Sequence, residues 1–439
     1  MEIFALGGYN EVGRNMTAIK TGDEIVIIDI GIYLPAIINL ESEERVDIPT
    51  KKLKKIGALP DDSIIVEQKD KVKAIVLGHC HLDHIAGVPF FAPRYTNAPV
   101  IGTPYTLEVL KEIMRDDEMS IPNKMITVNQ NSSVKISKNI TIELIGITHS
   151  TAQCAFVAVH TPEGTVLYCN DFKFDNSPQL GQPPNYKRLK ELKNVKALIC
   201  ESLYADRKGK TPSEKVAKEM LKDVLLGVEN KNNAIFVTTF ASHIARLSSI
   251  IEFGKKMKRE IVLLGRSMAK YVNAADRLKI VNFKKDVTIH GYAKQIKQVL
   301  KKIEKNRSKY LIVCTGSQGE PDSILDKIVR KKLEFNFKDG DHVIFSCKTI
   351  PEQINIENRA ALEEKLKKHK VRMFTDIHVS GHSSSEDLRD LIQMVKPKNV
   401  IPAHGEPAKQ ENLARIAEDC GYKMEKNLFV MHNGRKIIL

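Results

Sequence analysis

A cluster of metal-binding residue types, His79-Cys80-His81-Leu82-Asp83-His84, lies one residue beyond the apolar run from Ala74 to Leu77. Such a run, rich in β-branched residues, predicts a buried strand, so the cluster lies where a strand ends and a helix begins. His79 and His81 point to one side of the strand end, and the turn brings Asp83 and His84 towards the same space. Three imidazoles and a carboxylate this close together are costly to bury without a compensating cation. The cluster therefore predicts a site for divalent metal.

Three later apolar runs also end in residue types that bind metals. His149, Asp171 and His404 each come one or two residues after a strand-like run. Imidazole nitrogens mixed with carboxylate oxygens suit zinc, and manganese fits the same donors. The candidate ligands divide into His79, His81 and His149 for one metal and Asp83, His84 and His404 for a second, with Asp171 as the bridging carboxylate.

Two metals in one site define the chemistry that the site can perform. At a separation of about 3.5–4 Å they lower the pKa of a water between them and hold both oxygens of an in-line displacement. That chemistry hydrolyses phosphodiesters, and equally esters, thioesters or lactams. The ligand pattern thus predicts a hydrolytic enzyme and leaves the substrate class open.

Asp29 ends another apolar strand, Glu24 to Ile28. A buried carboxylate there needs a partner, and a histidine of the metal cluster would supply one, because ligand imidazoles need an outer acceptor. An ordinary strand-end turn, with an Asp before Gly31, explains the same local sequence. Both interpretations stay open.

The length and composition set broader limits. A chain of 439 residues exceeds the usual size of one hydrophobic core, so we expect two domains. No apolar run approaches the roughly 20 residues of a membrane span, and the N-terminus does not resemble a signal peptide. The seven cysteines are scattered, and several lie inside apolar strands. We therefore expect a cytoplasmic protein with reduced cysteines and no membrane partner.

The formal net charge is +14. This charge suits a polyanionic partner such as nucleic acid, although a lysine-rich solvated surface gives the same balance. Tryptophan is absent and aromatic residues make up 6 % of the chain. We therefore expect phosphate contacts rather than a broad platform for stacked bases.

A second domain is predicted after the charged linker Tyr204–Lys210. Thr211-Pro212-Ser213-Glu214 has the pattern of a capping box with Pro at the first helical position, so a helix begins there. Beyond it, strands and helices alternate as in a parallel α/β sheet. Ligands of such sheets bind beyond the carboxyl ends of the strands, where backbone amides favour phosphate. The loops at three of these strand ends contain His243, Arg266 and Ser317-Gln318-Gly319.

Taken together, these motifs resemble the metallo-β-lactamase superfamily and its β-CASP group. The His79 to His84 cluster with Asp29, His149 and Asp171 is similar to metallo-β-lactamase motifs one to four, and Glu201, His382 and His404 are similar to the three β-CASP motifs. More narrowly, the chain resembles the ribonuclease J family through Leu6–Met16, Gly265–Met268, Thr315–Pro321 and His378–His382. The chain stops at Leu439, where the core would close, whereas bacterial members carry a further C-terminal domain. The resemblance is thus to the archaeal type, and a homodimer is expected by analogy.

The resemblance implies an α/β fold in two parts. Residues 1–207 and 373–439 would form an αββα metallo-β-lactamase sandwich, and residues 208–372 a parallel α/β β-CASP domain inserted into it. RNA would enter between the two domains.

The resemblance also implies an activity. The implied enzyme is a 5′-to-3′ exoribonuclease with two Zn2+ per chain, or Mn2+ in their place. It would prefer 5′-monophosphorylated single-stranded RNA and release nucleoside monophosphates, and the resemblance also allows endonuclease activity. A metal-held hydroxide would attack phosphorus beside Asp83. His382, oriented by Glu201, is the candidate general acid for the departing 3′-oxygen. The candidate substrate-binding residues are His378, Val379, Ser380, Gly381 and His382 for phosphate, and His243, Arg266, Ser317, Gln318 and Gly319 for further nucleotides or the 5′ end.

Three other functions share part of this pattern. A hydrolase of a thioester, lactone or β-lactam would need neither the inserted α/β domain nor the pair His378 and His382. A non-catalytic RNA-binding subunit would have lost metal ligands, and here all seven positions are filled. An endoribonuclease of the archaeal cleavage-factor type, in a form without N-terminal KH domains, matches the motifs as well and is the main alternative.

Overall fold

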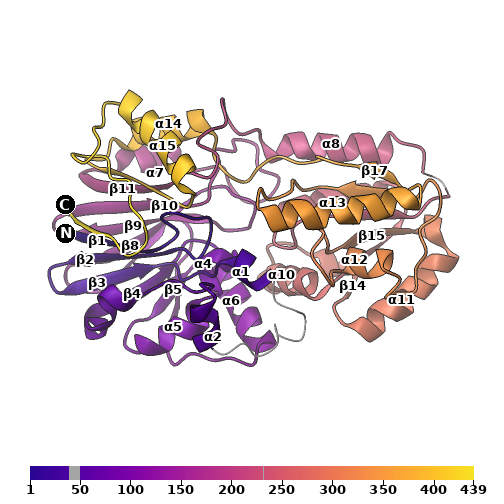
Figure 1. The fold of residues 1–439 in the computed structure, drawn as a ribbon, viewed down its shortest axis with the longest axis horizontal. Helices are drawn as coiled ribbons and strands as arrows, with labels where there is room; N and C mark the ends of the chain where they lie inside the picture. Colours follow the sequence, from indigo (N-terminus) through magenta and orange to yellow (C-terminus); the bar gives the residue numbers. More distant parts are fainter. Residues whose placement is uncertain (39–49, 231) are drawn as a thin grey trace. The chain divides into compact units, whose positions relative to one another are not determined.

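The computed structural model describes residues 1–38, 50–230 and 232–439 and divides into two compact units (Figure 1). The sandwich unit comprises Met1–Asn176, Gly181–Thr211 and Gly381–Leu439. The inserted unit comprises Ser177–Leu180 and Pro212–Ser380. Both ends of the chain belong to the sandwich unit, so the second unit is an insertion into the first, as expected.

The edges of the insertion differ from the expected 208–372. The compact inserted unit begins at Pro212 and ends at Ser380. Before it, the Thr211 hydroxyl donates a hydrogen bond to the His382 carbonyl (2.7 Å), which keeps Thr211 with the sandwich unit. At the far end, the Ile377 carbonyl accepts a hydrogen bond from the Ser346 hydroxyl (2.9 Å), which keeps this segment with the inserted unit. Long-range contacts of this kind leave no mark on the local sequence.

The sandwich unit contains two sheets with strand orders β19-β1-β2-β3-β4-β5-β6 and β18-β11-β10-β9-β8-β7. The first sheet comprises β1 (Glu2–Gly7), β2 (Met16–Thr21), β3 (Glu24–Ile28), β4 (Val72–Leu77), β5 (Val100–Gly102), β6 (Met125–Thr127) and β19 (Lys436–Ile438). The second comprises β7 (Ser132–Lys135), β8 (Thr141–Gly146), β9 (Ala155–Thr161), β10 (Gly164–Cys169), β11 (Val195–Glu201) and β18 (Val400–Ala403).

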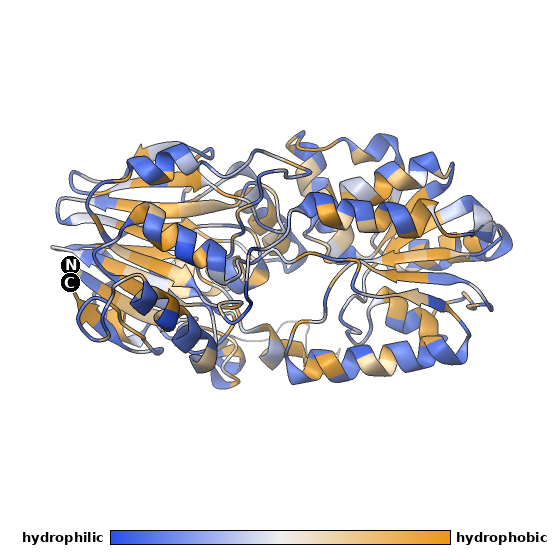
Figure 2. Ribbon diagram, turned by 90° about the horizontal axis from the view of Figure 1, so that it is seen from above, coloured by the Kyte–Doolittle hydropathy of each residue, from blue (hydrophilic) through white to orange (hydrophobic). Residues whose placement is uncertain are grey.

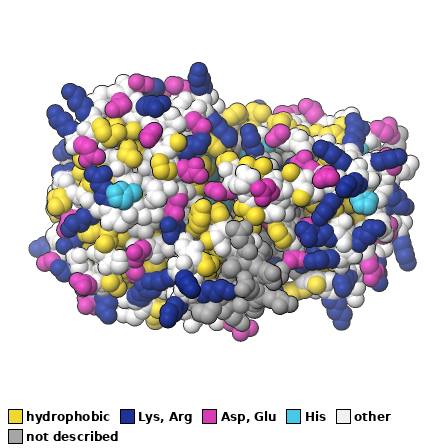
Figure 3. All heavy atoms as spheres, in the orientation of Figure 1, with side chains coloured by type: hydrophobic (Ala, Val, Ile, Leu, Met, Phe, Trp, Pro, Cys, Tyr) yellow, Lys and Arg dark blue, Asp and Glu magenta, His cyan; other side chains and the backbone are white. Residues whose placement is uncertain are grey.

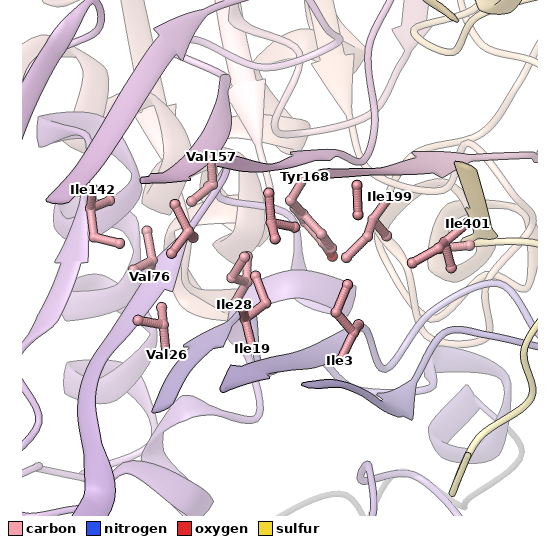
Figure 4. Close-up of a cluster of buried hydrophobic side chains, with 14 of the residues drawn as sticks. Ile3, Ile19, Val26, Ile28, Val76, Ile142, Val157, Tyr168, Ile199 and Ile401 are labelled. Atoms are coloured by element: carbon pink, nitrogen blue, oxygen red, sulfur yellow. The ribbon is translucent and has the colours of Figure 1, made fainter. Parts of the chain in front are cut away.

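The core of the sandwich unit lies between these sheets. Figure 4 shows side chains of both sheets pointing towards one another, among them Ile3, Ile28 and Val76 from the first and Val157 and Ile199 from the second. All five are fully buried. Strand residues alternate between the two faces of a sheet, so each sheet also has an outer apolar face that needs a cover.

Helices cover the outer faces and complete the expected αββα order. Leu189, Leu391 and Leu413, from α7, α14 and α15, pack with the outer face of the second sheet, and α6 packs against β5 and β6 of the first. The helices of this unit are α1 (Leu34–Ile38), α2 (Thr50–Lys55), α3 (Ser63–Val66), α4 (Leu82–Ile85), α5 (Val88–Phe91), α6 (Pro104–Asp116), α7 (Tyr186–Glu191), α14 (Ser385–Val395) and α15 (Pro407–Asp419).

The inserted unit is built on a parallel sheet with the strand order β14-β13-β15-β12-β16-β17. Its strands are β12 (Ile235–Thr238), β13 (Glu260–Leu264), β14 (Val287–His290), β15 (Tyr310–Cys314), β16 (His342–Phe345) and β17 (Arg372–Phe374). Its helices are α8 (Glu214–Leu226), α9 (Ile244–Lys256), α10 (Arg266–Arg277), α11 (Ala293–Lys305), α12 (Ile324–Val329) and α13 (Gln353–Lys368).

Both faces of this parallel sheet are covered, which is why its strands are apolar throughout. Phe236, Val262 and Ile312 pack with α11, α12 and α13. Ile261 and Leu311 lie on the opposite face, where a Cβ added to Gly254 of α9 would come within 2.8 Å of each. Figure 2 shows the strands of both units as hydrophobic and the helices with one hydrophilic side.

Helix α8 begins later than the capping-box pattern predicts. Its N-cap is Ser213, whose side chain accepts a hydrogen bond from the Lys215 amide (3.2 Å), and not Thr211. The Glu214 carboxylate does not turn back to cap the helix but pairs with Arg246 (2.5 Å). The prediction of the N-cap is therefore wrong, because the side chains of Thr211 and Glu214 bond residues that are remote in the sequence instead of capping the helix.

The region from Leu34 to Asp70 contains α1, α2 and α3, and residues 39–49 within it lie outside the described part. Two further expectations concern the cysteines and membrane spans. All seven cysteines are free thiols, six of them buried. Across the described ranges, no helix has the length and apolar character to cross a membrane.

Candidate metal centre

The candidate ligands sit directly after strands of the sandwich unit. His79 to His84 follow β4, while His149, Asp171 and His404 follow β8, β10 and β18. Strands β8 and β10 run in the same direction, since each is antiparallel to β9, and β10, β11 and β18 are parallel neighbours. These strands therefore end at one edge of the second sheet. The loops at that edge carry His149, Asp171 and His404, and the loop after β4 of the first sheet adds His79 to His84.

The first set of donors surrounds one point. Nε2 of His79 and Nε2 of His149 each lie 3.1 Å from Nδ1 of His81. Oδ2 of Asp171 lies 3.3 Å from Nε2 of His79 and 3.7 Å from Nε2 of His149. These four side chains form the first candidate site, as expected from the sequence.

The second set shares the Asp171 carboxylate. Nε2 of His84 lies 3.2 Å from Oδ2 of Asp171 and 3.4 Å from Oδ2 of Asp83. Nε2 of His404 lies 3.3 Å from Oδ1 of Asp171 and 4.0 Å from Oδ2 of Asp83. Asp171 therefore faces both sets, which is the position of a bridging ligand.

The spacing of these atoms fits bound cations. Tetrahedral zinc with ligand bonds of about 2.0–2.1 Å places neighbouring donors about 3.3 Å apart. The Nε2 atoms of His79 and His149 and the Nδ1 atom of His81 converge at that kind of spacing, where lone pairs repel unless a cation lies between them. Oδ1 of Asp171 is buried and has no hydrogen-bond partner. Both donor sets are thus suited to divalent metal.

Outer hydrogen bonds orient three of the ligand imidazoles. The pairs are His84 Nδ1 with Asp29 Oδ2 at 2.7 Å, His149 Nδ1 with the Gly381 carbonyl at 2.7 Å, and His404 Nδ1 with Asn15 Oδ1 at 3.0 Å. Because each partner is an oxygen acceptor, the ring proton sits on Nδ1 and the lone pair of Nε2 faces the centre. Of the two interpretations of Asp29, the structure therefore favours the outer partner of a ligand imidazole.

Asn15 is a site residue that the sequence reasoning missed. It is 1 % exposed, accepts the hydrogen bond from His404, and donates through Nδ2 to the Asp83 carbonyl (3.0 Å). It thereby connects two ligands that lie far apart in the sequence. The residue falls within Leu6–Met16, one of the segments similar to ribonuclease J, but nothing in that segment indicates which polar side chain turns inwards.

The protonation states follow from burial and from neighbouring charge. Burial lowers the pKa of His79, and lowers the pKa values of His81 and His149 well below their ordinary range. Neutral imidazoles are the form that binds metal. Burial also acts to lower the pKa of His84, but the carboxylates of Asp171 and Asp83 outweigh it and raise that pKa. The second donor set is therefore rich in negative charge, which a divalent cation would balance.

Three residues of the centre have left-handed backbone conformations. The φ angles are +56° at Asp29, +55° at Asp171 and +47° at His404. Such angles cost a non-glycine residue about 1–2 kcal/mol, although Asp and His tolerate them better than most residue types. Strain of this kind persists where the surrounding structure over-determines it, and it is concentrated at functional sites.

Glu201 and His382 form a pair beside the metal ligands. Oε2 of the fully buried Glu201 lies 2.6 Å from Nδ1 of His382, and Oε1 accepts a hydrogen bond from the Phe172 amide (2.8 Å). The His382 ring lies 5.0 Å from the His149 ring. Burial acts to lower the pKa of His382, but the charges of Glu201 and Asp171 outweigh it and raise the pKa to about 9. His382 is therefore protonated at neutral pH and able to donate a proton.

The segment His378–Gly381 divides between the two units. Gly381 belongs to the sandwich unit, and a Cβ there would come within 2.8 Å of Ser150 Oγ, so only glycine fits. His378 and Ser380 are half-buried and Val379 is 6 % exposed, so Val379 can offer a ligand mainly its backbone groups.

A buried ion pair lies behind His378 in the inserted unit. Arg246 is fully buried and bonds both oxygens of Glu214, at 2.5 and 2.9 Å. Its Nη1 atom also donates to the Ser346 carbonyl (2.9 Å) and lies 3.5 Å from Nδ1 of His378. Sequence reasoning missed this pair, because each residue alone reads as a helix-surface charge.

His243 does not have the position expected of a residue that contacts nucleotides. It is 3 % exposed, and its Nδ1 accepts a hydrogen bond from the Arg246 amide (3.2 Å) as the N-cap of α9. Its Nε2 lies 3.4 Å from the Glu214 carboxylate. The ring is thus enclosed by protein groups, and its structural role is to support the ion pair.

The Ser317-Gln318-Gly319 loop is also turned inwards. Gln318 is 3 % exposed and bonds the loop after β16, donating to the Lys348 carbonyl (3.0 Å) and accepting from the Ile350 amide (2.7 Å). Ser317 is equally buried, and Gly319 has φ +73°. The side chain of Gln318 therefore connects two loops through its hydrogen bonds. Arg266, in contrast, is exposed at the start of α10.

The surface charge does not by itself mark a substrate site. Figure 3 shows Lys and Arg side chains interspersed with Asp and Glu over both units on the face in view. On this face the cationic side chains are mixed with anionic ones, so charge alone does not single out a substrate site there.

Comparisons with known proteins identify the family. The chain matches the models "Beta-lactamase superfamily domain" over residues 58–210, "Ribonuclease J, beta-CASP domain" over 232–361 and "Zn-dependent metallo-hydrolase RNA specificity domain" over 368–427. A ribonuclease J of Pyrococcus abyssi is 42 % identical over 440 residues, covering 100 % of this chain and 97 % of that protein. The chain belongs to the ribonuclease J family.

Other members of the family extend this result. The ribonuclease J of Methanocaldococcus jannaschii is 42 % identical, covering 99 % of this chain and 98 % of that protein. Ribonuclease J 1 of Streptococcus pyogenes is 31 % identical, and the chain covers 74 % of it. A solved structure of a protein of unknown function from Enterococcus faecalis superposes with a TM-score of 0.67 over 100 % of the chain at 17 % identity, which supports the fold alone.

Membership in the ribonuclease J family confirms three predictions made from the sequence. The fold is a metallo-β-lactamase domain with an inserted β-CASP domain. The protein is a metal-dependent ribonuclease, a hydrolase whose substrate is RNA. The buried histidines and aspartates provide a metal-binding site.

Proposed function

We propose that this ribonuclease J family member degrades single-stranded RNA from its 5′ end and releases nucleoside monophosphates. We also propose that it prefers a 5′-monophosphate and holds two zinc ions, or two manganese ions, per chain. The observation that carries the proposal is the Asp171 carboxylate, which lies between two donor sets and within 3.3 Å of a histidine of each. When bound, two divalent cations at these donors would balance the charge of a phosphate group and lower the pKa of a nearby water.

The residues around the donor sets would move the proton. His382 would donate a proton to the 3′-oxygen that leaves, since its pKa of about 9 keeps it charged at neutral pH. Glu201 would hold the ring through Nδ1 and so direct Nε2 at the substrate. Because Oε1 of Glu201 also accepts from the Phe172 amide, next to Asp171, one carboxylate sets the position of the acid relative to the ligands.

The chain offers hydrogen-bond donors for the substrate phosphate near this acid. Ser380 and the Gly381 amide, which precede His382 directly, are candidates to hold phosphate oxygens, and His378 is a third. The exposed Arg266 is a candidate for a phosphate further along the strand. His243 and Gln318 are not proposed as direct contacts, because protein groups enclose both side chains.

The test follows the label on RNA of defined sequence with a radioactive 5′-monophosphate. We expect wild-type protein to release labelled mononucleotide from the first time point, and chelator to stop the release. Asp83→Ala and His382→Ala should each reduce the rate by at least about 100-fold. His432→Ala, which removes an exposed histidine of the sandwich unit, serves as the matched control and should retain the wild-type rate.

Other outcomes would change the assignment. Discrete internal fragments without early mononucleotide would contradict the exonuclease proposal and favour an endonuclease of the cleavage-factor type. RNA bound without degradation would favour a non-catalytic subunit. Equal rates on 5′-monophosphate and 5′-hydroxyl RNA would contradict the proposed end preference.

Two further proposals concern the state of the protein in the cell. We propose a cytoplasmic location, since all seven cysteines are unpaired thiols, as is usual in a reducing compartment. We propose a homodimer on the basis of the family resemblance, and light scattering of the purified protein tests it. A mass equal to one 49.4 kDa chain would contradict the dimer.

A further inference from the structure

The inserted unit has an exposed aromatic side chain that the proposed function does not use. Tyr292 lies two residues after the end of β14 and is 66 % exposed. Within the part of the chain that the structure describes, it is the aromatic member of the group of exposed large hydrophobic side chains. A single exposed tyrosine is common on protein surfaces, so its surroundings decide whether it has a role.

Tyr292 lies beside Arg266 at the carboxyl edge of the sheet. Strands β13 and β14 pair in parallel with Leu264 opposite His290, and Arg266 and Tyr292 each come two residues later. The Gly265 amide donates to the His290 carbonyl (3.0 Å), which extends the pairing beyond the strands. A Cβ added to Gly291 would lie 3.8 Å from Cα of Arg266. An aromatic ring and a guanidinium group thus start from neighbouring points of the backbone.

The same edge continues to His378, the candidate phosphate ligand. Four strands of the sheet are each followed, beyond their carboxyl ends, by one of the side chains considered. Along the sheet these are Tyr292 after β14, Arg266 after β13, Phe240 after β12 and His378 after β17. The Phe240 and His378 rings lie 6.4 Å apart, edge to face. Thr315 follows β15, the strand between β13 and β12. It packs against Gly265, where an added Cβ would come within 2.8 Å of the threonine side chain. The edge runs without a break for about 24 Å at roughly 4.8 Å per strand.

This edge has the chemistry that single-stranded nucleic acid requires. Aromatic rings stack on bases of any sequence, and cationic side chains contact the phosphates between them. Tyr292 provides an exposed ring, and Phe240 provides a half-buried ring that packs partly on the core of the unit. Arg266 and Lys348 provide exposed cations. Lys294 and Lys297, both exposed, add charge in the first turns of α11 next to Tyr292. The low aromatic content of the chain predicts no broad stacking platform, and this pair of rings is compatible with that.

We propose that Tyr292 stacks on a base of the RNA substrate, with Arg266 on the adjacent phosphate, several nucleotides downstream of the nucleotide held at His378. The inference rests on the proposed function, because it takes His378 as the position near the reacting end. It adds a distant subsite that favours long RNA over short RNA. A 5′-monophosphorylated dinucleotide is too short to reach from His378 to Tyr292, whereas a 20-nucleotide RNA spans the edge.

The test measures the length preference, defined as kcat/KM on the 20-nucleotide RNA divided by kcat/KM on the dinucleotide. We expect Tyr292→Ala to lower this ratio about tenfold, since loss of one stacked base typically weakens binding by this order. Tyr292→Phe keeps the ring and should keep the ratio. Arg266→Ala should lower the ratio and also make the ratio less dependent on salt concentration. Lys309→Ala removes one exposed cation at the amino edge of the same sheet and is the control with an unchanged ratio.

A second readout does not depend on catalysis. Fluorescence anisotropy of the labelled 20-nucleotide RNA in the presence of chelator should show about tenfold weaker binding by Tyr292→Ala. If wild-type protein degrades no RNA, the proposed function fails, and this titration still decides the role of Tyr292. An unchanged ratio with unchanged binding, or an equal loss on both RNAs, would overturn the subsite. A change of oligomeric state in Tyr292→Ala, measured by light scattering, would also overturn the subsite, because Tyr292 would then lie between protein chains.

Discussion

Nδ1 of His84 lies 2.7 Å from Oδ2 of Asp29, while the other Asp29 oxygen accepts a hydrogen bond from the Gly78 amide (2.9 Å). Both side chains are fully buried. The carboxylate therefore connects the end of β3 to the metal-ligand cluster after β4, and it decides which nitrogen of His84 carries the proton. A ligand of the second donor set depends on a residue that is not itself a ligand.

Replacement of Asp29 by Asn tests this dependence. The Asn oxygen can still accept from Gly78, but its NH2 group would face Nδ1 of His84 and force the ring proton onto Nε2, where the metal should bind. We expect Asp29→Asn to weaken metal binding about 10- to 100-fold with little change in fold. Calorimetric titration of metal-free protein with zinc measures this, and circular dichroism checks the fold. Wild-type affinity would contradict the role of Asp29.

The pH dependence of activity should report on His382. Its raised pKa of about 9 means that the proton-donating form is present below that pH and is lost as the pH rises through it. Glu201→Gln removes the neighbouring negative charge, so the pKa of His382 falls and the alkaline loss of kcat shifts to lower pH. Glu143→Gln, which also changes a carboxylate paired with a histidine (His160, 2.7 Å), should leave the profile in place. An unshifted profile in Glu201→Gln would exclude His382 as the titrating acid.

The buried pair of Arg246 and Glu214 should matter for stability. Arg246→Met leaves the Glu214 carboxylate buried without its bidentate partner, a change that typically costs 3–5 kcal/mol, so we expect a loss of about that size in the free energy of unfolding. Urea denaturation of the full chain measures it. The double variant with Glu214→Leu should recover most of the loss. Lys301→Met breaks an exposed pair with Glu334 in the same unit and should cost less than about 1 kcal/mol.

Removal of metal should destabilise the sandwich unit. A metal that binds only the folded state contributes about 2.7 kcal/mol when its free concentration is 100-fold above Kd. We therefore expect chelator to lower the melting temperature of wild-type protein and added zinc to restore it. Asp83→Ala lacks one ligand and should show a smaller shift in differential scanning fluorimetry. A melting temperature that does not respond to chelator would contradict a metal-loaded centre.

The ligands could be predicted from the sequence because each follows a recognisable strand. An apolar run that ends in His or Asp shows in the local pattern both the strand and the residue at its end. His79, His149, Asp171 and His404 are of this kind, and the structure brings them together in two donor sets. The alternation of strands and helices after position 211 likewise predicts the parallel sheet of the inserted unit.

Residues that act through packing could not be predicted in this way. His243 and Gln318 stand in loops that favour ligand binding, yet burial turns both towards protein groups. Asn15 and Arg246 look like ordinary polar residues, and only contacts with His404 and Glu214 give them roles. Thr211 is not the N-cap expected from the sequence, because its hydroxyl donates a hydrogen bond to the carbonyl of His382, more than 170 residues later in the sequence.

The sequence by itself determined the residue types of the metal centre, the strand ends that carry them and the presence of a second, parallel α/β unit after position 211. These properties depend on short-range patterns of hydrophobicity and on the chemistry of neighbouring side chains. Only the tertiary structure decided which nitrogen of each of three ligand imidazoles carries the proton and which loop side chains point inwards. Those features depend on distances between residues remote in the chain, and such distances exist only once the two sheets of the sandwich have packed together.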